Sequence, residues 1–294
     1  MSTRPFQKIA LAAAALALFT FTSCSSTSSE EGSDAIVVGS QAYYSNEIIA
    51  EIYAQALEAE GFTVERQFQL GQRDIYMPAL LDGEIDLFPE YTGNLLQFFD
   101  PEAQVTESTA VYEALVAALP ENLTALAMSP ATDQDSYNVT AEFAKKHDLT
   151  SIADLADVPN LRLGGAPELA ERPYGPVGLF ETYGVSVEFE ATGDTTVDAL
   201  VADIVNIANV YSADPKIGQF DLVTLEDPKG LFLASNVVPI ARTELAPELA
   251  AVIDPLSEAM TSQQLIAMNL QSVEEKKSAK TIAAEWLKQN GFVD

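Results

Sequence analysis

Residues 83–93 read Gly-Glu-Ile-Asp-Leu-Phe-Pro-Glu-Tyr-Thr-Gly. Residues 85–88 form a short apolar run that predicts a buried strand, and Pro89 is expected to end it because proline has no N–H for the ladder. Residues 74–81, just upstream, have the spacing of a short helix that Gly83 would terminate. The stretch therefore predicts a helix and then a buried strand, with polar and aromatic residues directly after the strand.

The residues before this stretch continue the alternation of strand and helix. Residues 35–38 are an apolar run ended by glycine and serine, and residues 62–68 alternate apolar and polar side chains. Between them, apolar side chains recur at helical spacing, with Ser45 or Asn46 as the expected cap and Gly61 at the C-terminal end. Strand, helix, strand, helix and strand with short links predict a parallel α/β unit.

A second unit of the same kind follows later in the chain. Its expected strands are residues 161–163, 185–189, 204–211 and 220–225, its expected helices are residues 178–183 and 195–202, and two further helices are expected at residues 261–270 and 272–289. Two such units predict an α/β protein of two lobes. In open α/β sheets ligands bind beyond the carboxyl ends of the strands, so the site is expected there.

The composition excludes several classes of function. The chain has 294 residues and a net charge of -29, which repels the phosphate backbone of nucleic acids. With one cysteine and one histidine, it forms no internal disulfide and no multi-histidine metal site. His147, next to two lysines, is expected in the last turn of a helix, where a cation is favourable. Because no nucleotide-binding glycine loop or nucleophile motif occurs, we expect no catalysis, no cofactor and no metal.

The N-terminal residues have the pattern of an export signal. Arg4 and Lys8 precede an apolar run at residues 9–21, which is too short to span a bilayer, and Cys24 follows. This pattern resembles a bacterial lipobox and predicts a lipoprotein signal peptide at residues 1–23, with lipid attachment at Cys24. Residues 24–34 predict a flexible tether, because residues 25–33 are mostly serine, threonine and glutamate with one glycine. The alternative is an ordinary signal peptide with an incidental cysteine.

The sequence resembles the glycine betaine/choline/proline betaine-binding proteins of osmoprotectant ABC importers. Residues 83–93 are the most specific part of this resemblance, which covers residues 36–240 and includes Gly39-Ser40, Glu51-Ile52-Tyr53, Leu70-Gly71, Pro167-Glu168, Glu171-Arg172, residues 210–214 and residues 221–227. The resemblance implies a class II periplasmic-binding-protein fold with a two-stranded hinge. Lobe I would comprise residues 35–133 and 234–294, and lobe II residues 134–233.

The resemblance also implies a ligand site between the lobes. Family members box a quaternary ammonium group with tyrosines, and the matching positions are Tyr91, Tyr137 and Tyr211. Asp135 matches an aspartate at the edge of the box, and Arg172 matches an arginine that holds a carboxylate. Three positions depart from the family pattern: Gln41 replaces a lysine, Asn94 a threonine and Ser235 a fourth tyrosine. The missing wall could come from Tyr43, Tyr44, Tyr174 or Phe232.

The expected function is therefore that of a receptor without catalysis. It would be tethered by lipid to the outer face of the cytoplasmic membrane, bind a betaine-type solute between its lobes and deliver it to an ABC permease. The changes at Gln41, Asn94 and Ser235 leave open other small polar ligands, such as an ergothioneine-like betaine, an amino acid or an amine. A sensory surface lipoprotein with the same fold is a further alternative.

Overall fold

The computed structural model describes residues 35–293. The predicted signal peptide, the lipid attachment at Cys24 and the tether at residues 24–34 lie outside the described residues. Among the helices of residues 35–293, none combines the length and apolar character that crossing a membrane requires.

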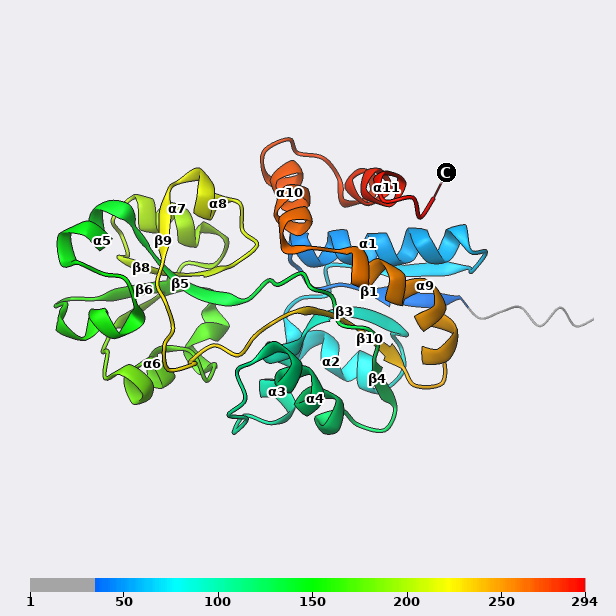
Figure 1. Ribbon diagram of the computed structural model, residues 1–294, viewed down its shortest axis with the longest axis horizontal. Helices are drawn as coiled ribbons and strands as arrows, with labels where there is room; N and C mark the ends of the chain where they lie inside the picture. The colour runs from blue at the N-terminus through cyan, green and yellow to red at the C-terminus, as the bar shows by residue number, and fades with distance from the viewer. Residues whose placement is uncertain (1–34, 294) are drawn as a thin grey trace, which may run out of the picture. The chain divides into compact units, whose positions relative to one another are not determined.

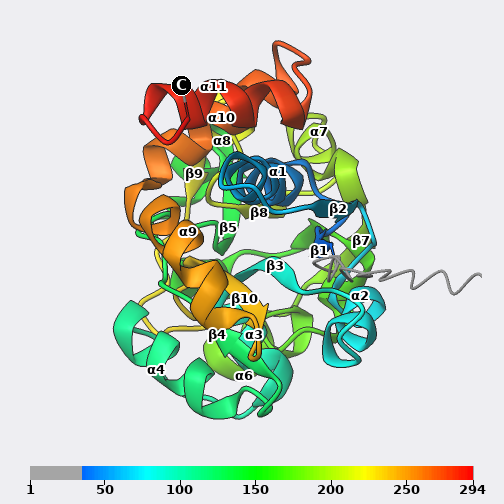
Figure 2. The same cartoon turned by 90° about the vertical axis from the view of Figure 1, so that its right-hand side faces the viewer.

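The first of two mixed sheets has five strands in the order β2-β1-β3-β10-β4. Their bounds are Ile36–Gly39 for β1, Val64–Gln67 for β2, Leu87–Tyr91 for β3, Leu123–Ala125 for β4 and Val237–Arg242 for β10. One face is covered by α1 (Tyr44–Ala59), α9 (Ala246–Ala259), α10 (Ser262–Val273) and α11 (Ala279–Gln289). The other face is covered by α2 (Arg73–Leu81), α3 (Thr92–Phe99) and α4 (Ser108–Ala118). Figures 1 and 2 show these two helical layers on either side of the sheet.

Helix α1 forms where the sequence predicted a helix, because its apolar residues share one face. Ile48, Ile52 and Tyr53 are fully buried and pack in the same core as Trp286 and Leu287 of α11. Burying an aliphatic or aromatic side chain of this size contributes roughly 1.5–3 kcal/mol. The predicted cap was wrong, since the helix begins at Tyr44, before both Ser45 and Asn46.

Strand β3 runs through Pro89, so the expectation that this proline ends the strand was wrong. Pro89 lies opposite Pro239 in the antiparallel pairing of β3 with β10. The two missing N–H groups therefore fall at one position of the ladder, where they disturb it least. The strand consequently extends to Tyr91, which it delivers to the edge of the sheet.

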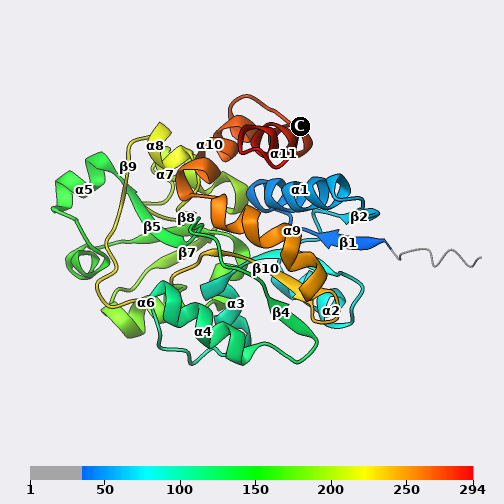
Figure 3. The ribbon, with the colours of Figure 1, turned by 45° about the vertical axis from the view of Figure 1, so that its right-hand side comes forward.

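The second sheet has the strand order β7-β6-β8-β5-β9. Its strands are β5 (Asp135–Thr140), β6 (Arg162–Gly165), β7 (Glu188–Ala191), β8 (Ile207–Tyr211) and β9 (Leu222–Thr224). The helices of this region are α5 (Ala141–His147), η1 (Ile152–Asp157), η2 (Pro167–Glu171), α6 (Pro176–Tyr183), η3 (Gly193–Thr195), α7 (Thr196–Val201) and α8 (Lys216–Gln219). His147 is in the last turn of α5, as predicted. In Figure 3, α7 and α8 lie on one face of this sheet and α6 lies on the other.

Two antiparallel segments connect the sheets. The backbone N–H of Asp133 donates to the carbonyl of Ser235 at 3.1 Å, the N–H of Val237 donates to Ala131 at 2.9 Å, and Thr132 bridges Asn236. These contacts form the two-stranded hinge that the predicted fold class requires. The parallel pairs β1–β2, β1–β3, β6–β7 and β6–β8 also follow the prediction. The lobe boundaries at residues 133/134 and 233/234 stay a prediction.

Candidate ligand-binding site

A cavity lies at the carboxyl ends of the parallel strands of both sheets, which is the position expected for ligand sites in this architecture. Residues from both sheets contribute: Gln41 follows β1, Tyr91 ends β3, Ala166 follows β6 and Tyr211 ends β8. The full lining is Gln41, Tyr43, Gln72, Arg73, Tyr91, Asn94, Asp133, Asp135, Ala166, Glu168, Leu169, Arg172, Tyr174, Asn209 and Tyr211.

Six of the eight residues predicted to bind ligand line this cavity, and two do not. The six are Gln41, Tyr91, Asn94, Asp135, Arg172 and Tyr211. The structure does not bring Tyr137 or Ser235 into the lining. Two of the four aromatic residues named as substitute walls, Tyr43 and Tyr174, do line it.

Three tyrosines of the lining lie near one another: Tyr43, Tyr91 and Tyr211, which we call the tyrosine cage. The ring centroids of Tyr43 and Tyr211 are 5.2 Å apart with an interplanar angle of 49°. Burial is the main cause that raises the pKa of all three hydroxyls well above the ordinary value for tyrosine. The rings are therefore neutral at physiological pH, and their electron-rich faces are available to a cation.

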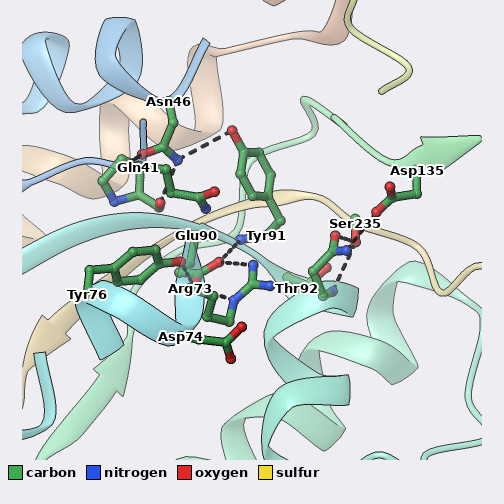
Figure 4. Close-up of polar contacts among 12 residues, drawn as sticks. Gln41, Asn46, Arg73, Asp74, Tyr76, Glu90, Tyr91, Thr92, Asp135 and Ser235 are labelled. Atoms are coloured by element: carbon green, nitrogen blue, oxygen red, sulfur yellow. Dashed lines mark hydrogen bonds and ion pairs between the residues drawn. The ribbon is translucent and has the colours of Figure 1, made fainter. Parts of the chain in front are cut away.

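Buried polar contacts hold Tyr91 in place. The Asn46 side-chain amide donates to the hydroxyl of Tyr91 at 3.4 Å and to the carbonyl of Pro89 at 2.8 Å. The backbone N–H of Tyr91 donates to Oε2 of Glu90 at 3.0 Å. Figure 4 shows the ring of Tyr91 turned toward Asn46. The ring is thus fixed by partners at both its hydroxyl and its backbone.

A buried ion pair lies beside the cage. Arg73 donates from Nε and Nη2 to the two carboxylate oxygens of Glu90, each at 2.8 Å, and the Tyr76 hydroxyl donates to the same carboxylate at 2.5 Å. Figure 4 shows Arg73 and Tyr76 converging on Glu90. Because Glu90 is fully buried and Arg73 nearly so, this network neutralises Arg73 at the cavity wall and fixes the end of β3.

Tyr137 is fully buried in the core of the second sheet, where its ring packs edge-on against Phe232 with centroids 5.1 Å apart. Its hydroxyl donates to the backbone carbonyl of Tyr174 at 2.5 Å. Tyr137 and Asp135 share one face of β5, but two residues of strand separate them by about 6.6 Å. Asp135 therefore reaches the cavity, while Tyr137 lies behind Tyr174 and supports it.

Asn94 and Ser235 form a polar link near the hinge. The Ser235 hydroxyl donates to Oδ1 of Asn94 at 2.8 Å and accepts from its backbone N–H at 3.2 Å. The Asn94 amide in turn donates to Asp135 at 2.8 Å and to the Tyr174 hydroxyl at 2.9 Å. Gly93 permits the approach, because a Cβ there would lie 2.7 Å from the Ser235 hydroxyl oxygen. Ser235 thus positions Asn94, which joins α3 to the second sheet.

The charges at the cavity are mostly acidic. Asp133, Asp135 and Glu168 line it, and burial raises the pKa of Asp135 although the Asn94 hydrogen bond acts against this. Arg172 is its second lining cation and lies 3.5 Å from Asp74, whose side chain is largely exposed. An exposed pair of this kind is weak, so Arg172 remains available to a ligand carboxylate.

Several buried polar atoms around the cavity have no hydrogen-bond partner in the described part of the chain. They are Nε2 of Gln41, the hydroxyl of Tyr43, Oδ2 of Asp133, Oε1 of Glu168 and Nδ2 of Asn209. An unsatisfied buried polar group costs roughly 1–3 kcal/mol, so native proteins rarely keep several together without a purpose. This concentration indicates a site built for a polar ligand.

Sequence reasoning missed five polar lining residues: Gln72, Arg73, Asp133, Glu168 and Asn209. One signal could have identified Asp133. It lies two positions before Asp135, and alternate residues of an extended segment share a face. Nothing in the local sequence distinguishes Arg73 from a surface arginine, since its partner Glu90 lies 17 residues away.

Comparison with known proteins gives the family and the fold of this chain. The model of the family described as the substrate binding domain of ABC-type glycine betaine transport system matches residues 34–289. The glycine betaine-binding protein YehZ of Escherichia coli (strain K12) is 27% identical over 282 residues, which cover 89% of this chain and 92% of that protein.

Two further relatives extend the comparison. The ergothioneine transport permease/ergothioneine binding protein EgtU of Helicobacter pylori (strain G27) is 24% identical over 87% of this chain, which spans 48% of that protein. A crystal structure of a glycine betaine/carnitine/choline ABC transporter protein superposes with a TM-score of 0.73 at 24% identity, covering 88% of this chain and 100% of that one, and shows the same fold. With its family model matched over residues 34–289, the chain belongs to the substrate-binding domains of ABC-type glycine betaine transport systems.

Proposed function

We propose that this substrate-binding protein captures a quaternary ammonium solute in the tyrosine cage and delivers it to an ABC permease from the outer side of the cytoplasmic membrane. The observation that carries the proposal is the gathering of Tyr43, Tyr91 and Tyr211 at one cavity that also contains the carboxylates of Asp133, Asp135 and Glu168. Tyr43 lies between β1 and α1, Tyr91 ends β3 of the first sheet and Tyr211 ends β8 of the second, so a ligand between them favours the arrangement in which both sheets contribute.

The chemistry of a trimethylammonium group matches this lining. The group has no N–H, so ordinary hydrogen bonds cannot select it, whereas aromatic faces attract it by about 2 kcal/mol per desolvated ring. Three rings supply roughly 6 kcal/mol of the about 8 kcal/mol that micromolar affinity requires. The nearby carboxylates supply further attraction.

The rest of the cavity suits a second polar group on the same ligand. Gln41 has a free Nε2 donor, and Arg172 offers a planar guanidinium that binds a carboxylate through two parallel hydrogen bonds. The Asn94 amide is already committed to Asp135 and Tyr174. A ligand carboxylate would therefore lie closer to Gln41 and Arg172 than to Asn94.

A larger betaine is the second candidate. A ligand with only a carboxylate and a trimethylammonium group would leave Oε1 of Glu168 and Nδ2 of Asn209 without hydrogen-bond partners. These two atoms suit a ligand with an additional polar ring. The relative named for ergothioneine binding supports including such a betaine, although it is no more similar to this chain than the glycine betaine-binding relative.

Isothermal titration calorimetry of the purified protein against choline, glycine betaine, carnitine, ergothioneine and unmethylated amino acids tests the proposal. We expect at least one quaternary ammonium compound to bind with a micromolar Kd and the unmethylated amino acids to bind at least a hundredfold more weakly, because they are better solvated by water than by rings. The cage would be refuted if an unmethylated amino acid bound and no quaternary ammonium compound gave a heat of binding.

We further propose that Cys24 carries the lipid that holds the protein at the membrane. Replacing it, Cys24→Ala, is expected to move the protein from the membrane fraction to the soluble extracytoplasmic fraction, because no acyl chain can then be attached. Fractionation and immunoblotting measure this. A variant that still sediments with membranes would contradict the lipid anchor, and wild-type protein released by detergent is the control.

A further inference from the structure

Asp133 is a buried carboxylate that lines the same cavity as the tyrosine cage. It lies in the hinge segment, is 2% exposed and lines the cavity. Its Oδ1 accepts a hydrogen bond from the backbone N–H of Ala213 at 3.0 Å, whereas Oδ2 has no partner within residues 35–293. Folding therefore provides a hydrogen bond to only one of the two carboxylate oxygens.

The cage and the carboxylate are close neighbours. Burial and then the charge of Asp133 raise the pKa of the Tyr43 and Tyr91 hydroxyls, and Asp133 acts in the same direction on Tyr211. All three rings of the cage thus experience the field of this single carboxylate. A cation seated among the rings would experience it as attraction.

The groups that face Asp133 provide no positive charge. Asp135, on β5, and Asp214, after β8, are both acidic and disfavour its ionisation. The hydrogen bond from the backbone N–H of Ala213 and the nearby hydroxyl of Ser45, on α1, favour the carboxylate, and both groups are neutral. Neither of the two lining arginines forms an ion pair with Asp133, since Arg73 is paired with Glu90 and Arg172 lies beside Asp74.

We propose that Asp133 is the counter-ion of the ligand's cationic head and makes the cage select a cation over a neutral group of the same shape. This inference rests on the proposed function and adds to it a residue that determines specificity. The unpartnered Oδ2 supplies the missing contact, and the burial of Asp133 shields it from bulk water. Ring faces alone attract a cation modestly, whereas a desolvated carboxylate adds a full opposite charge.

The counter-ion role has a consequence for pH. Burial raises the pKa of Asp133 to about 7, so the free site holds much of this carboxyl in its protonated form at neutral pH. A bound cation stabilises the carboxylate, so the proton passes from Asp133 to solvent as the ligand enters. Affinity for a cation should therefore rise as the pH increases toward 7, by up to tenfold per unit, and level off above that value.

Calorimetry with choline as the probe tests the proposal, using the wild-type protein and Asp133→Asn. Asparagine keeps the size and an acceptor for Ala213 but cannot ionise. At pH 8 we expect choline to bind the variant at least tenfold more weakly. Titrations at pH 6.5 in two buffers of different ionisation enthalpy should show proton release from the wild type and none from the variant.

Two controls make the result specific. The uncharged isostere 3,3-dimethylbutan-1-ol, which replaces the nitrogen by carbon, should bind wild type and Asp133→Asn with equal affinity. Glu65→Gln removes the same charge at an exposed position of β2 outside the cavity lining and should change choline affinity by less than threefold.

The outcomes separate this inference from the function on which it rests. Equal choline affinity in wild type and Asp133→Asn, or wild-type binding at pH 6.5 without proton release, would overturn the counter-ion role. The proton count needs only the wild-type protein, so the test holds even if the variant fails to fold. A wild type that binds no quaternary ammonium compound would instead overturn the proposed function itself.

Discussion

The variant Tyr91→Ala is expected to bind the best quaternary ammonium ligand at least a hundredfold more weakly than the wild type. Tyr91 supplies one ring of the tyrosine cage, worth about 2 kcal/mol to a desolvated cation. Its removal also opens the cage to water, which weakens the attraction of the remaining rings and of Asp133. A hundredfold change corresponds to about 2.7 kcal/mol, and calorimetry measures it directly.

Tyr91→Phe is the matched control, because it keeps the ring and removes only the hydroxyl. That hydroxyl accepts a single long hydrogen bond of 3.4 Å from Asn46, so we expect affinity within about fivefold of the wild type. Circular dichroism should show that both variants retain the fold. Wild-type affinity in Tyr91→Ala, or equal losses in both variants, would be incompatible with a cation held by ring faces.

The parts of the fold that the sequence predicted are those with local signals. Helix α1 has a buried apolar face that any helical pattern detects, and Gly61 follows it with φ +92°. Strand β1 and the first two residues of β3, Leu87 and Phe88, are apolar and lie next to glycine or polar residues. In each of these cases the residues that form an element also contain the information for it.

The sequence did not predict β10 or the passage of β3 through Pro89, because both depend on distant partners. β10 enters the first sheet from more than a hundred residues away and pairs antiparallel with β3. Only this pairing places Pro89 opposite Pro239 and makes the proline acceptable within the strand. A prediction made from neighbouring residues alone therefore ends the strand at Pro89.

The candidate site shows the same division. Tyr91 and Tyr211 could be predicted because they end strands, and the ends of parallel strands converge. Tyr137 could not be placed by its motif alone, because its position depends on the ring of Phe232, which packs against it, and on the backbone carbonyl of Tyr174, to which its hydroxyl donates. Asp133 belongs to the hinge segment. It lines the cavity because its backbone N–H pairs with the distant Ser235, which fixes the path of that segment.

The variant Glu90→Gln is expected to lower the free energy of unfolding by about 3–5 kcal/mol, the usual cost of leaving one charge of a buried pair uncompensated. Arg73 would remain nearly buried without its bidentate carboxylate, and the glutamine amide would face two donors, from Arg73 and Tyr76. Urea unfolding followed by fluorescence measures the loss. Glu58→Gln, at the exposed end of the Arg66 pair, should cost less than about 1 kcal/mol.

The double variant Arg73→Met with Glu90→Gln separates a charge effect from a packing effect. If the uncompensated guanidinium causes the loss, removing it should restore much of the stability, because a buried ion pair replaced by neutral groups is often nearly neutral in free energy. A double variant as unstable as the sum of the single variants would show that the pair acts through shape instead. Because Glu90 also accepts the N–H of Tyr91, restored stability with weakened ligand binding would show that this carboxylate supports the fold through Arg73 and the cage through Tyr91.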